Sequence, residues 1–247
     1  MTPHEHDIMR AVEDSYWWYQ ALRQHVADSL AAASPRFSLL DAGCGAGGML
    51  HVLRQKFPEA DLTGIDQSEY ALAVTAARGT GARLLHGSVN ELPFPEDSFD
   101  FVLSLDVLTH AGIDDALALH EARRVLRPGG ALVVNLAAFD FLRGAHDEAV
   151  DVDRRYTRPQ LRALLAAEGF AVPRMTYWNA TLMPPIALAR WLSRVRPSHK
   201  QPRSDLKPLP PFLNAILQRI ALLELSMSRH LSLPFGTSLL AFARKHG

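Results

Sequence analysis

The chain has 247 residues, 48% of them apolar, and its 26 basic and 26 acidic residues balance. That length and apolar fraction suffice for a single large domain with a buried core. Zero net charge argues against a nucleic-acid partner, and the single cysteine, Cys44, excludes an intramolecular disulfide and gives no reason to expect a metal site. The first residues are polar and no run of eighteen apolar residues occurs, so we expect a cytoplasmic protein without a membrane span.

Apolar residues recurring at intervals of three and four predict an N-terminal helix over 7–33, within a cap segment formed by 1–34. Four consecutive aromatic residues, 16–19, lie in this helix. They cannot all face one core, so we expect some of them to cap a pocket. Arg23 follows Tyr19 by one turn and is expected to pair with a carboxylate.

Apolar strands and helices then alternate. We expect strands over 37–40, 61–66, 82–85, 99–105 and 131–137, and helices over 49–57, 68–78 and 113–126. This alternation predicts a doubly wound α/β fold with right-handed crossovers.

The regular alternation of strands and helices ends after residue 138. We expect an irregular stretch over 139–156, a helix over 157–168, a strand over 170–178, helices near 184–195 and 210–231, and a last strand over 233–244.

A glycine-rich segment after the first strand is the clearest functional signal, and two cofactors compete for it. Gly43, Gly45 and Gly48 satisfy the G-x-G-x-x-G spacing of dinucleotide-binding proteins, and Asp66 follows Gly43 by 23 residues, where a ribose-binding acid is expected. The segment from Asp41 onward equally satisfies the acid-x-G-x-G-x-G pattern of proteins that bind S-adenosylmethionine. The spacing alone does not decide between them.

Three later segments favour the second cofactor. They are Asp66 at a strand end, Leu92–Asp100, and Leu126–Gly130, and with the glycine loop they occur in order within 90 residues. With these segments, residues 37–178 resemble a class I S-adenosylmethionine-dependent methyltransferase of the ubiquinone-biosynthesis-like group, methyltransferase type 11. The segments Leu92–Asp100 and Leu126–Gly130 are not expected in a dinucleotide-dependent dehydrogenase.

The resemblance implies a Rossmann-like seven-stranded sheet in the order 3-2-1-4-5-7-6, with strand 7 antiparallel. Residues 170–178 would be strand 6 and 233–244 strand 7 of a single methyltransferase domain, 1–247. Residues 181–232 would be a helical insertion between them. Three roles are open for this insertion: a lid, a homodimer interface, or a contact with a membrane or a lipid-linked substrate.

The resemblance also implies cofactor contacts. The glycine loop would hold the methionine part, Asp41 would favour its ammonium and sulfonium charges, and Asp66 would accept hydrogen bonds from the ribose hydroxyls. Ser88 stands where the family usually has an Asp that receives the adenine amino group. The full expected set is Tyr19, Arg23, Asp41, Ala42, Gly43, Cys44, Gly45, Asp66, Gln67, Ser88, Val89, Leu105, Asp106 and His110.

Methyl transfer needs a base only when the acceptor must lose a proton. His110, His146 and Tyr156 are the expected catalytic residues, each to be weighed against an ordinary loop side chain. The expected acceptor is a small molecule with a bulky apolar or lipid-like part. The alternative is a scaffold that binds S-adenosylmethionine, or a cyclase or isomerase on the same fold, without methyl transfer.

Overall fold

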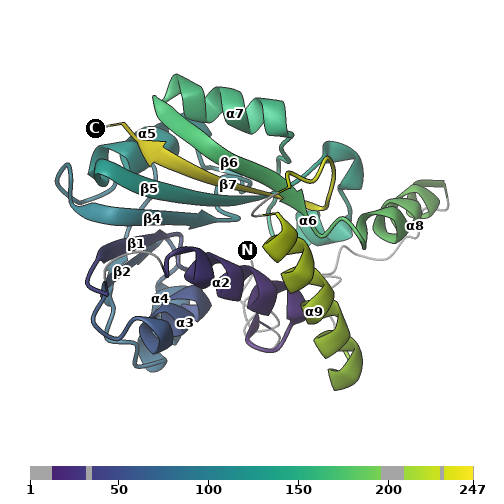
Figure 1. The fold of residues 1–247 in the computed structure, drawn as a ribbon, viewed down its shortest axis with the longest axis horizontal. Coiled ribbons are helices and arrows are strands. Elements are labelled where there is room, and N and C mark those ends of the chain that lie inside the picture. The colour runs from purple at the N-terminus through teal and green to yellow at the C-terminus, as the bar shows by residue number, and fades with distance from the viewer. Residues whose placement is uncertain (1–12, 32–34, 196–208, 229–230, 247) are drawn as a thin grey trace.

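The computed structural model describes residues 13–31, 35–195, 209–228 and 231–246 (Figure 1). The strands are β1 Ser38–Ala42, β2 Asp61–Asp66, β3 Arg83–His86, β4 Phe99–Leu105, β5 Leu126–Ala137, β6 Phe170–Trp178 and β7 Ser238–Lys245. The helices are α2 Trp17–Ser29, α3 Gly48–Lys56, α4 Glu69–Ala77, α5 Asp115–Val125, α6 Ala145–Ala149, α7 Arg158–Ala167, α8 Met183–Val195 and α9 Pro211–Met227, with a 3₁₀ turn η1 at Asp140–Leu142.

The strands form one sheet in the order β3-β2-β1-β4-β5-β7-β6, which confirms the predicted topology. β1 to β5 run parallel, whereas β7 lies antiparallel between β5 and β6. The carboxyl ends of the parallel strands therefore share one edge, and the loops that leave β1, β2 and β4 meet there. Such an edge is where open α/β sheets bind their ligands.

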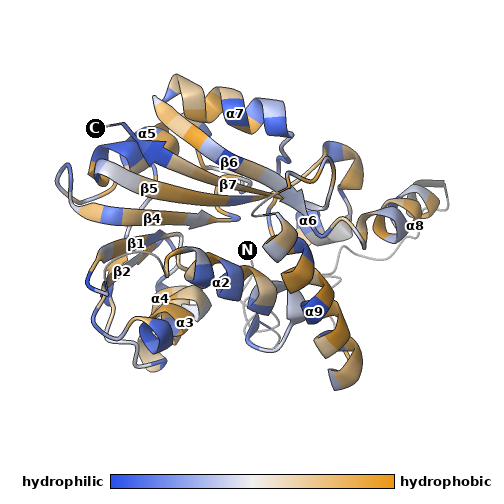
Figure 2. Cartoon of the chain, in the orientation of Figure 1, coloured by the Kyte–Doolittle hydropathy of each residue, from blue (hydrophilic) through white to orange (hydrophobic). Residues whose placement is uncertain are grey.

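Helices cover both faces of the sheet (Figure 1). α2, α3 and α9 pack over one face and α5 and α7 over the other, each around its own cluster of buried apolar side chains. The hydropathy colouring agrees, since the central strands are mainly apolar (Figure 2). Strands that are buried on both faces are expected to be apolar along their whole length.

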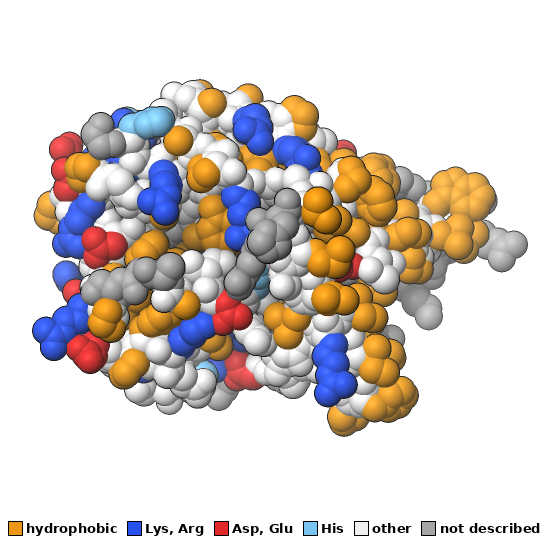
Figure 3. All heavy atoms as spheres, viewed as in Figure 1, with side chains coloured by type: hydrophobic (Ala, Val, Ile, Leu, Met, Phe, Trp, Pro, Cys, Tyr) orange, Lys and Arg blue, Asp and Glu red, His pale blue; other side chains and the backbone are white. Residues whose placement is uncertain are grey.

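The insertion between β6 and β7 forms the helices α8 and α9, which project from one end of the molecule (Figures 1 and 3). α9 lies along α2, and α8 contacts the η1 turn. Among the described residues, no helix is both long and apolar enough to cross a bilayer.

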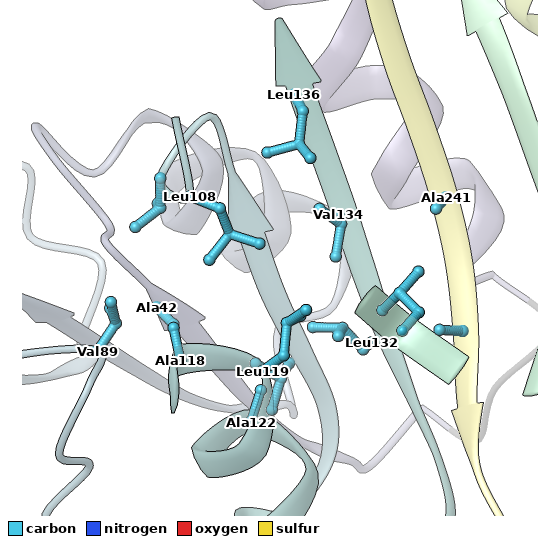
Figure 4. Packing of buried hydrophobic residues seen from close by; sticks show 14 of the residues in the cluster. Ala42, Val89, Leu108, Ala118, Leu119, Ala122, Leu132, Val134, Leu136 and Ala241 are labelled. Atoms are coloured by element: carbon cyan, nitrogen blue, oxygen red, sulfur yellow. The ribbon is translucent and has the colours of Figure 1, made fainter. Parts of the chain in front are cut away.

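The buried cluster beneath α5 shows why the fold holds together (Figure 4). Leu132, Val134 and Leu136 on β5 are fully buried, and Leu119 on α5, which belongs to the same cluster, lies beside Leu132. Burying a side chain of this size contributes about 1.5–3 kcal/mol. This cluster fixes β4 and β5, whose ends carry site residues.

Several element boundaries differ from the sequence prediction. α2 begins only at Trp17, because Asp14 and Ser15 form a turn and Tyr16 is extended, and residues 1–12 lie outside the described structure. β5 begins at Leu126 rather than 131, since Leu126 pairs with Phe99.

The last strand begins at Ser238 rather than 233. Pro234 lacks an amide proton for a strand ladder, and Leu233 forms only an isolated bridge with Tyr177. The stretch 139–156, predicted to be irregular, contains η1 and α6.

Candidate active site

The loop after β1 is held against the end of β2 by backbone hydrogen bonds. The amides of Gly43 and Cys44 both donate to the carbonyl of Ile65, at 2.8 and 3.0 Å. Gly43 has φ +83°, and a Cβ there would overlap Val107. Only glycine combines that conformation with that close approach.

Asp66, at the carboxyl end of β2, completes the loop. One carboxylate oxygen accepts from the Gly45 amide at 2.9 Å, and the other accepts from the Ser68 amide at 2.9 Å. A carboxylate has about four acceptor sites in all. Asp66 therefore anchors the loop while keeping capacity for a ligand's hydroxyl groups.

Gly48 has a different role from the first two glycines. It lies in the first turn of α3, and a Cβ there would overlap the guanidinium of Arg23. Arg23 is buried and forms an ion pair with Glu13. The third glycine of the G-x-G-x-x-G spacing is thus explained by packing against an arginine, which removes the main argument for a dinucleotide.

A cavity of about 720 Å³ opens along the carboxyl edge of the sheet. It brings together most of the residues predicted to bind a cofactor: Tyr19, Arg23, Asp41, Gly43, Cys44, Gly45, Asp66, Gln67, Val89, Leu105, Asp106 and His110. All four aromatic residues of the N-terminal helix also line it, so the expectation that some of them cap a pocket is confirmed.

Two of the predicted cofactor residues are not among those that line the cavity. Ala42 is buried in β1 beneath the loop. Ser88 accepts hydrogen bonds from the Gln67 side chain at 3.0 Å and the Asn90 amide at 3.1 Å. Its neighbours Gly87 and Val89 reach the cavity instead.

Two acidic groups give the cavity its electrostatic character. Burial raises the pKa of Asp41 to about 7, against the opposing effect of Arg23, and burial likewise raises the pKa of Asp106 to about 7. A buried carboxylate ionises more readily when a cation lies beside it. The pair therefore suits a positively charged ligand.

The hydroxyl of Tyr19 and the thiol of Cys44 line the same region as Asp106 and Asp41. Burial, together with the charge of Asp106, raises the pKa of Tyr19, and burial raises the pKa of Cys44. Both groups remain protonated at neutral pH and can act as hydrogen-bond donors.

The Asp106 carboxylate is held by a network that the sequence analysis missed. The Asn135 side-chain amide donates to both Asp106 oxygens, at 3.0 Å each. The indole of Trp178 in turn donates to the Asn135 oxygen at 2.9 Å. Trp18 of α2 stacks on Trp178 with ring centroids 5.2 Å apart. Asn135 and Trp178 are fully buried, so the network is shielded from water.

The three predicted catalytic residues differ in how they relate to the cavity. His110 lines the cavity, and burial lowers its pKa against the opposing effect of Asp151. Tyr156 is buried, and its hydroxyl contacts the Leu108 carbonyl at 3.2 Å and the Asp115 carboxylate at 2.7 Å. Tyr156 is not among the cavity's lining residues. His146 lies in α6, and its side chain is outside the described structure.

Apolar side chains from later segments of the chain also line the cavity, among them Ala111, Ile113, Ala137, Leu142, Val150, Val152 and Ile186. Polar residues of these segments line it as well, including a buried ion pair in which Arg155 donates to one oxygen of Asp147 at 2.7 and 3.0 Å. Ile186 and Arg190 come from α8, so the insertion contributes to the wall of the cavity.

The fold, and the glycine loop that follows Asp41 and is completed by Asp66, are typical of Rossmann-like, class I methyltransferases, whose cofactor is S-adenosylmethionine. The model of the methyltransferase domain family matches residues 40–134 of the chain. The recognition and the cofactor predicted from the sequence are thereby confirmed.

Individual proteins show the same similarity. A probable S-adenosylmethionine-dependent methyltransferase of Mycolicibacterium smegmatis is 29% identical over 172 residues, covering 68% of this chain and 64% of the relative. Demethylmenaquinone methyltransferase of Listeria monocytogenes is 38% identical over 101 residues, covering 38% of this chain and 42% of the relative. The chain thus spans less than two thirds of the length of these curated relatives.

Geranyl diphosphate C-methyltransferase from Streptomyces coelicolor A3(2), solved with Mg²⁺, geranyl diphosphate and S-adenosyl-L-homocysteine, superposes with a TM-score of 0.62. The alignment covers 92% of this chain and 79% of that one, at 16% identity. At that identity the likeness shows the fold alone.

Proposed function

We propose that this protein transfers the methyl group of S-adenosylmethionine to a small molecule with a bulky apolar part. The observation that carries the proposal is one cavity of about 720 Å³, whose lining combines Asp66 and the glycine loop with apolar side chains such as Leu142, Val150 and, from α8, Ile186. That volume lies within the range of about 300–1,000 Å³ that small-molecule sites occupy. Cofactor and acceptor would share it.

The charged groups support distinct roles at the cofactor end. Asp66 would accept hydrogen bonds from the ribose hydroxyls, and Arg23 would take the methionine carboxylate. Asp41 would pair with the ammonium group, and Asp106, at the end of β4, with the sulfonium. The two positive groups of the cofactor, the ammonium and the sulfonium, would thus lie beside the two carboxylates whose pKa burial raises to about 7.

The reaction asks little chemistry of the protein. The sulfonium supplies a good leaving group: the acceptor's nucleophile bonds to the methyl carbon, the S–C bond breaks, and its electron pair stays on sulfur. The protein aligns the two partners and excludes water. His110, kept neutral because burial lowers its pKa, would take the proton from a hydroxyl or amine acceptor.

Two facts support an apolar acceptor. The cavity lining includes the apolar side chains of Ile113, Leu142, Val150, Val152 and Ile186. In addition, a relative 38% identical over 101 residues is a demethylmenaquinone methyltransferase. The charge of Arg155, which also lines the cavity, is paired with Asp147.

Calorimetry with S-adenosylmethionine, S-adenosylhomocysteine and NADH tests the cofactor. We expect the first two to bind and Asp66→Ala to weaken both by at least about tenfold. Incubation with methyl-labelled cofactor and a cell extract then tests transfer, with label expected in solvent-extractable small molecules. Cofactor binding without any labelled product would instead favour a scaffold, cyclase or isomerase, and binding of NADH alone would overturn the proposal.

A further inference from the structure

Exposed apolar side chains are concentrated in the insertion. Among the described residues, nine of the twelve large apolar side chains that are exposed lie between 188 and 235: Leu188, Trp191, Leu192, Phe212, Ile216, Leu223, Met227, Leu231 and Phe235. Figure 3 shows that hydrophobic side chains, coloured orange, gather where α8 and α9 project from the molecule. Contiguous exposed apolar surface of this kind marks an interaction site.

α9 differs from an ordinary surface helix in which of its side chains face solvent. Its polar residues face inward: Asn214 accepts from the Trp17 amide at 2.8 Å, and Glu224 accepts from the amides of Ala180 and Thr181 at 2.8 and 2.9 Å. Its outward stripe is mostly apolar, with Phe212 69% exposed.

That stripe continues at intervals of three and four through Ile216, Arg219, Leu223 and Met227, and Leu223 is 63% exposed. The opposite face packs Ala221 and Leu225 into the core. A helix that is apolar on both faces is normally covered on both.

α8 also has two faces. Ile186 and Arg190, four residues apart, line the cavity. Leu188, Trp191 and Leu192 are exposed, with Trp191 59% exposed. Tryptophan combines a large apolar ring with one polar group and favours the boundary between lipid and water.

Charge identifies the surface that fits these helices. Between residues 188 and 219 the sequence has seven basic residues and one acidic residue, Asp205, although the whole chain is balanced. This is a property of sequence, because 196–208 lie outside the described structure. This basic sequence, including Arg219, which is exposed within the apolar stripe of α9, favours an anionic lipid surface. Each basic residue near such a surface contributes about 1 kcal/mol.

We propose that α8 and α9 dock this protein on an anionic lipid bilayer, with Trp191 and Phe212 inserted at the level of the headgroups. The docking does not depend on methyl transfer. If the proposed function also holds, an apolar acceptor would pass from the bilayer to the cavity along α8, whose inner face lines it.

A second copy of the chain fits this surface less well. In a two-fold dimer the same patch faces itself, and Arg219, which is exposed within the apolar stripe of α9, would then face the stripe of the other copy. Like charges across an interface disfavour association. An anionic bilayer supplies the opposite charge.

Vesicle flotation of the full chain tests the proposal. The probes are vesicles of phosphatidylcholine alone and of phosphatidylcholine with about 30 mol% phosphatidylglycerol. We expect flotation with the anionic vesicles, weakened at about 0.5 M salt, where charges are strongly screened. The double variant Trp191→Ser/Leu192→Ser should lose at least about tenfold in lipid affinity, because two inserted side chains are removed.

Leu117→Ser is the matched control, since Leu117 is 45% exposed on α5 and Leu192 is 46% exposed on α8. It should float like the unaltered protein, and calorimetry with S-adenosylhomocysteine should give unchanged binding in all variants. Equal losses in the control, or no flotation of the unaltered protein, would overturn the proposal. So would a dimer in analytical ultracentrifugation that Trp191→Ser/Leu192→Ser dissociates.

Discussion

The side-chain amide of Asn135 donates to both carboxylate oxygens of Asp106, at 3.0 Å each. The Asp106 backbone amide also donates to the Asn135 carbonyl at 2.7 Å, so the two residues are joined through main chain and side chain. Asp106 needs this support because it has φ +61°, in the left-handed region that disfavours side chains. Asn135 therefore fixes the carboxylate that the proposed function places beside the sulfonium.

Replacing Asn135 should move the pH dependence of cofactor binding. Asn135 lowers the pKa of Asp106 against the effect of burial, so Asn135→Leu should raise that pKa further above about 7. At neutral pH the affinity for S-adenosylmethionine should fall by about tenfold for each unit of pKa. S-adenosylhomocysteine, which lacks the sulfonium charge, should lose less. Calorimetric titrations at several pH values measure both.

Two aromatic variants distinguish the hydrogen bond that positions Asn135 from the packing of the ring that donates it. Trp178→Phe keeps a ring beside Trp18 but removes the indole donor to Asn135, so it should shift the pH dependence in the same direction by a smaller amount. Tyr177→Phe removes the hydroxyl that accepts from the Arg158 amide, away from Asp106, and should shift nothing. Equal losses for both cofactor forms in Asn135→Leu would indicate general distortion instead.

Cofactor binding should release protons. Asp41 and Asp106 have pKa values near 7 in the ligand-free protein because they are buried, and a cation beside them favours their ionised forms. Affinity for S-adenosylmethionine should therefore rise between about pH 6 and pH 8. Calorimetry in buffers of different ionisation enthalpy counts the protons released; observed heats that are the same in every buffer would contradict the prediction.

The same carboxylates should affect stability in the opposite sense. Their folded-state pKa lies above the unfolded value of about 3.9, so their contribution is fully present below about pH 4 and is lost as pH rises through about 7. Asp41→Asn should therefore stabilise the ligand-free protein more at pH 8 than at pH 5, while weakening cofactor binding. Thermal unfolding at the two pH values, with and without S-adenosylmethionine, measures both effects.

Apolar periodicity predicted the strands, the helices and the doubly wound class, whereas the strand order, the insertion and the cofactor residues followed from the family resemblance. Asp41, the glycine loop and Asp66 lie at strand ends that the apolar periodicity locates. Asn135 could not be found that way, since it lies within an apolar strand and its partners Asp106 and Trp178 are 29 and 43 residues away.

Tyr156 illustrates the converse error. A tyrosine in a charged loop after strand 5 suggested an acceptor site, but its hydroxyl reaches 41 residues back to Asp115. Buried tyrosine hydroxyls usually find such a partner. Sequence gives the presence of the hydroxyl, whereas only the packing of α5 against this loop gives its direction.

Gly48→Ala should weaken cofactor binding with little loss of stability. The added Cβ would overlap the guanidinium of Arg23, which is a flexible side chain and can move away. Alanine is favoured over glycine within a helix by about 1 kcal/mol, which offsets part of the cost. The displaced Arg23 would lose its ion pair with Glu13, and affinity for S-adenosylmethionine should fall by about tenfold.

A double-mutant cycle with Arg23→Ala checks this explanation. If Gly48→Ala acts through Arg23, the double variant should bind the cofactor no more weakly than Arg23→Ala alone. Additive losses measured by calorimetry would show that the glycine contacts the cofactor by a separate route.

His110→Asn should reduce transfer while leaving the cofactor bound. Burial lowers the pKa of His110 below its ordinary value, so the side chain is neutral and able to accept a proton at pH 7. Loss of a general base typically costs about 10²–10⁴-fold in rate. Methyl-label transfer measures the rate, and it should also fall in the unaltered protein at acidic pH, where His110 becomes protonated. Undiminished transfer by His110→Asn would show that the acceptor needs no base from this residue.

Asp147→Ala should destabilise the folded protein. Asp147 is only 1% exposed; one oxygen accepts from Arg155 at 2.7 and 3.0 Å, and the other accepts from the Gly144 amide at 2.7 Å. Removing one partner of a buried ion pair leaves an uncompensated charge, and the free energy of unfolding should fall by about 3–5 kcal/mol. Asp140→Ala is the control, because the ion pair of Asp140 with Arg143 is much more exposed and should contribute only about 0–1 kcal/mol. Denaturant unfolding measures both variants, and equal losses would mean that Asp147 and Arg155 contribute no more than a surface pair.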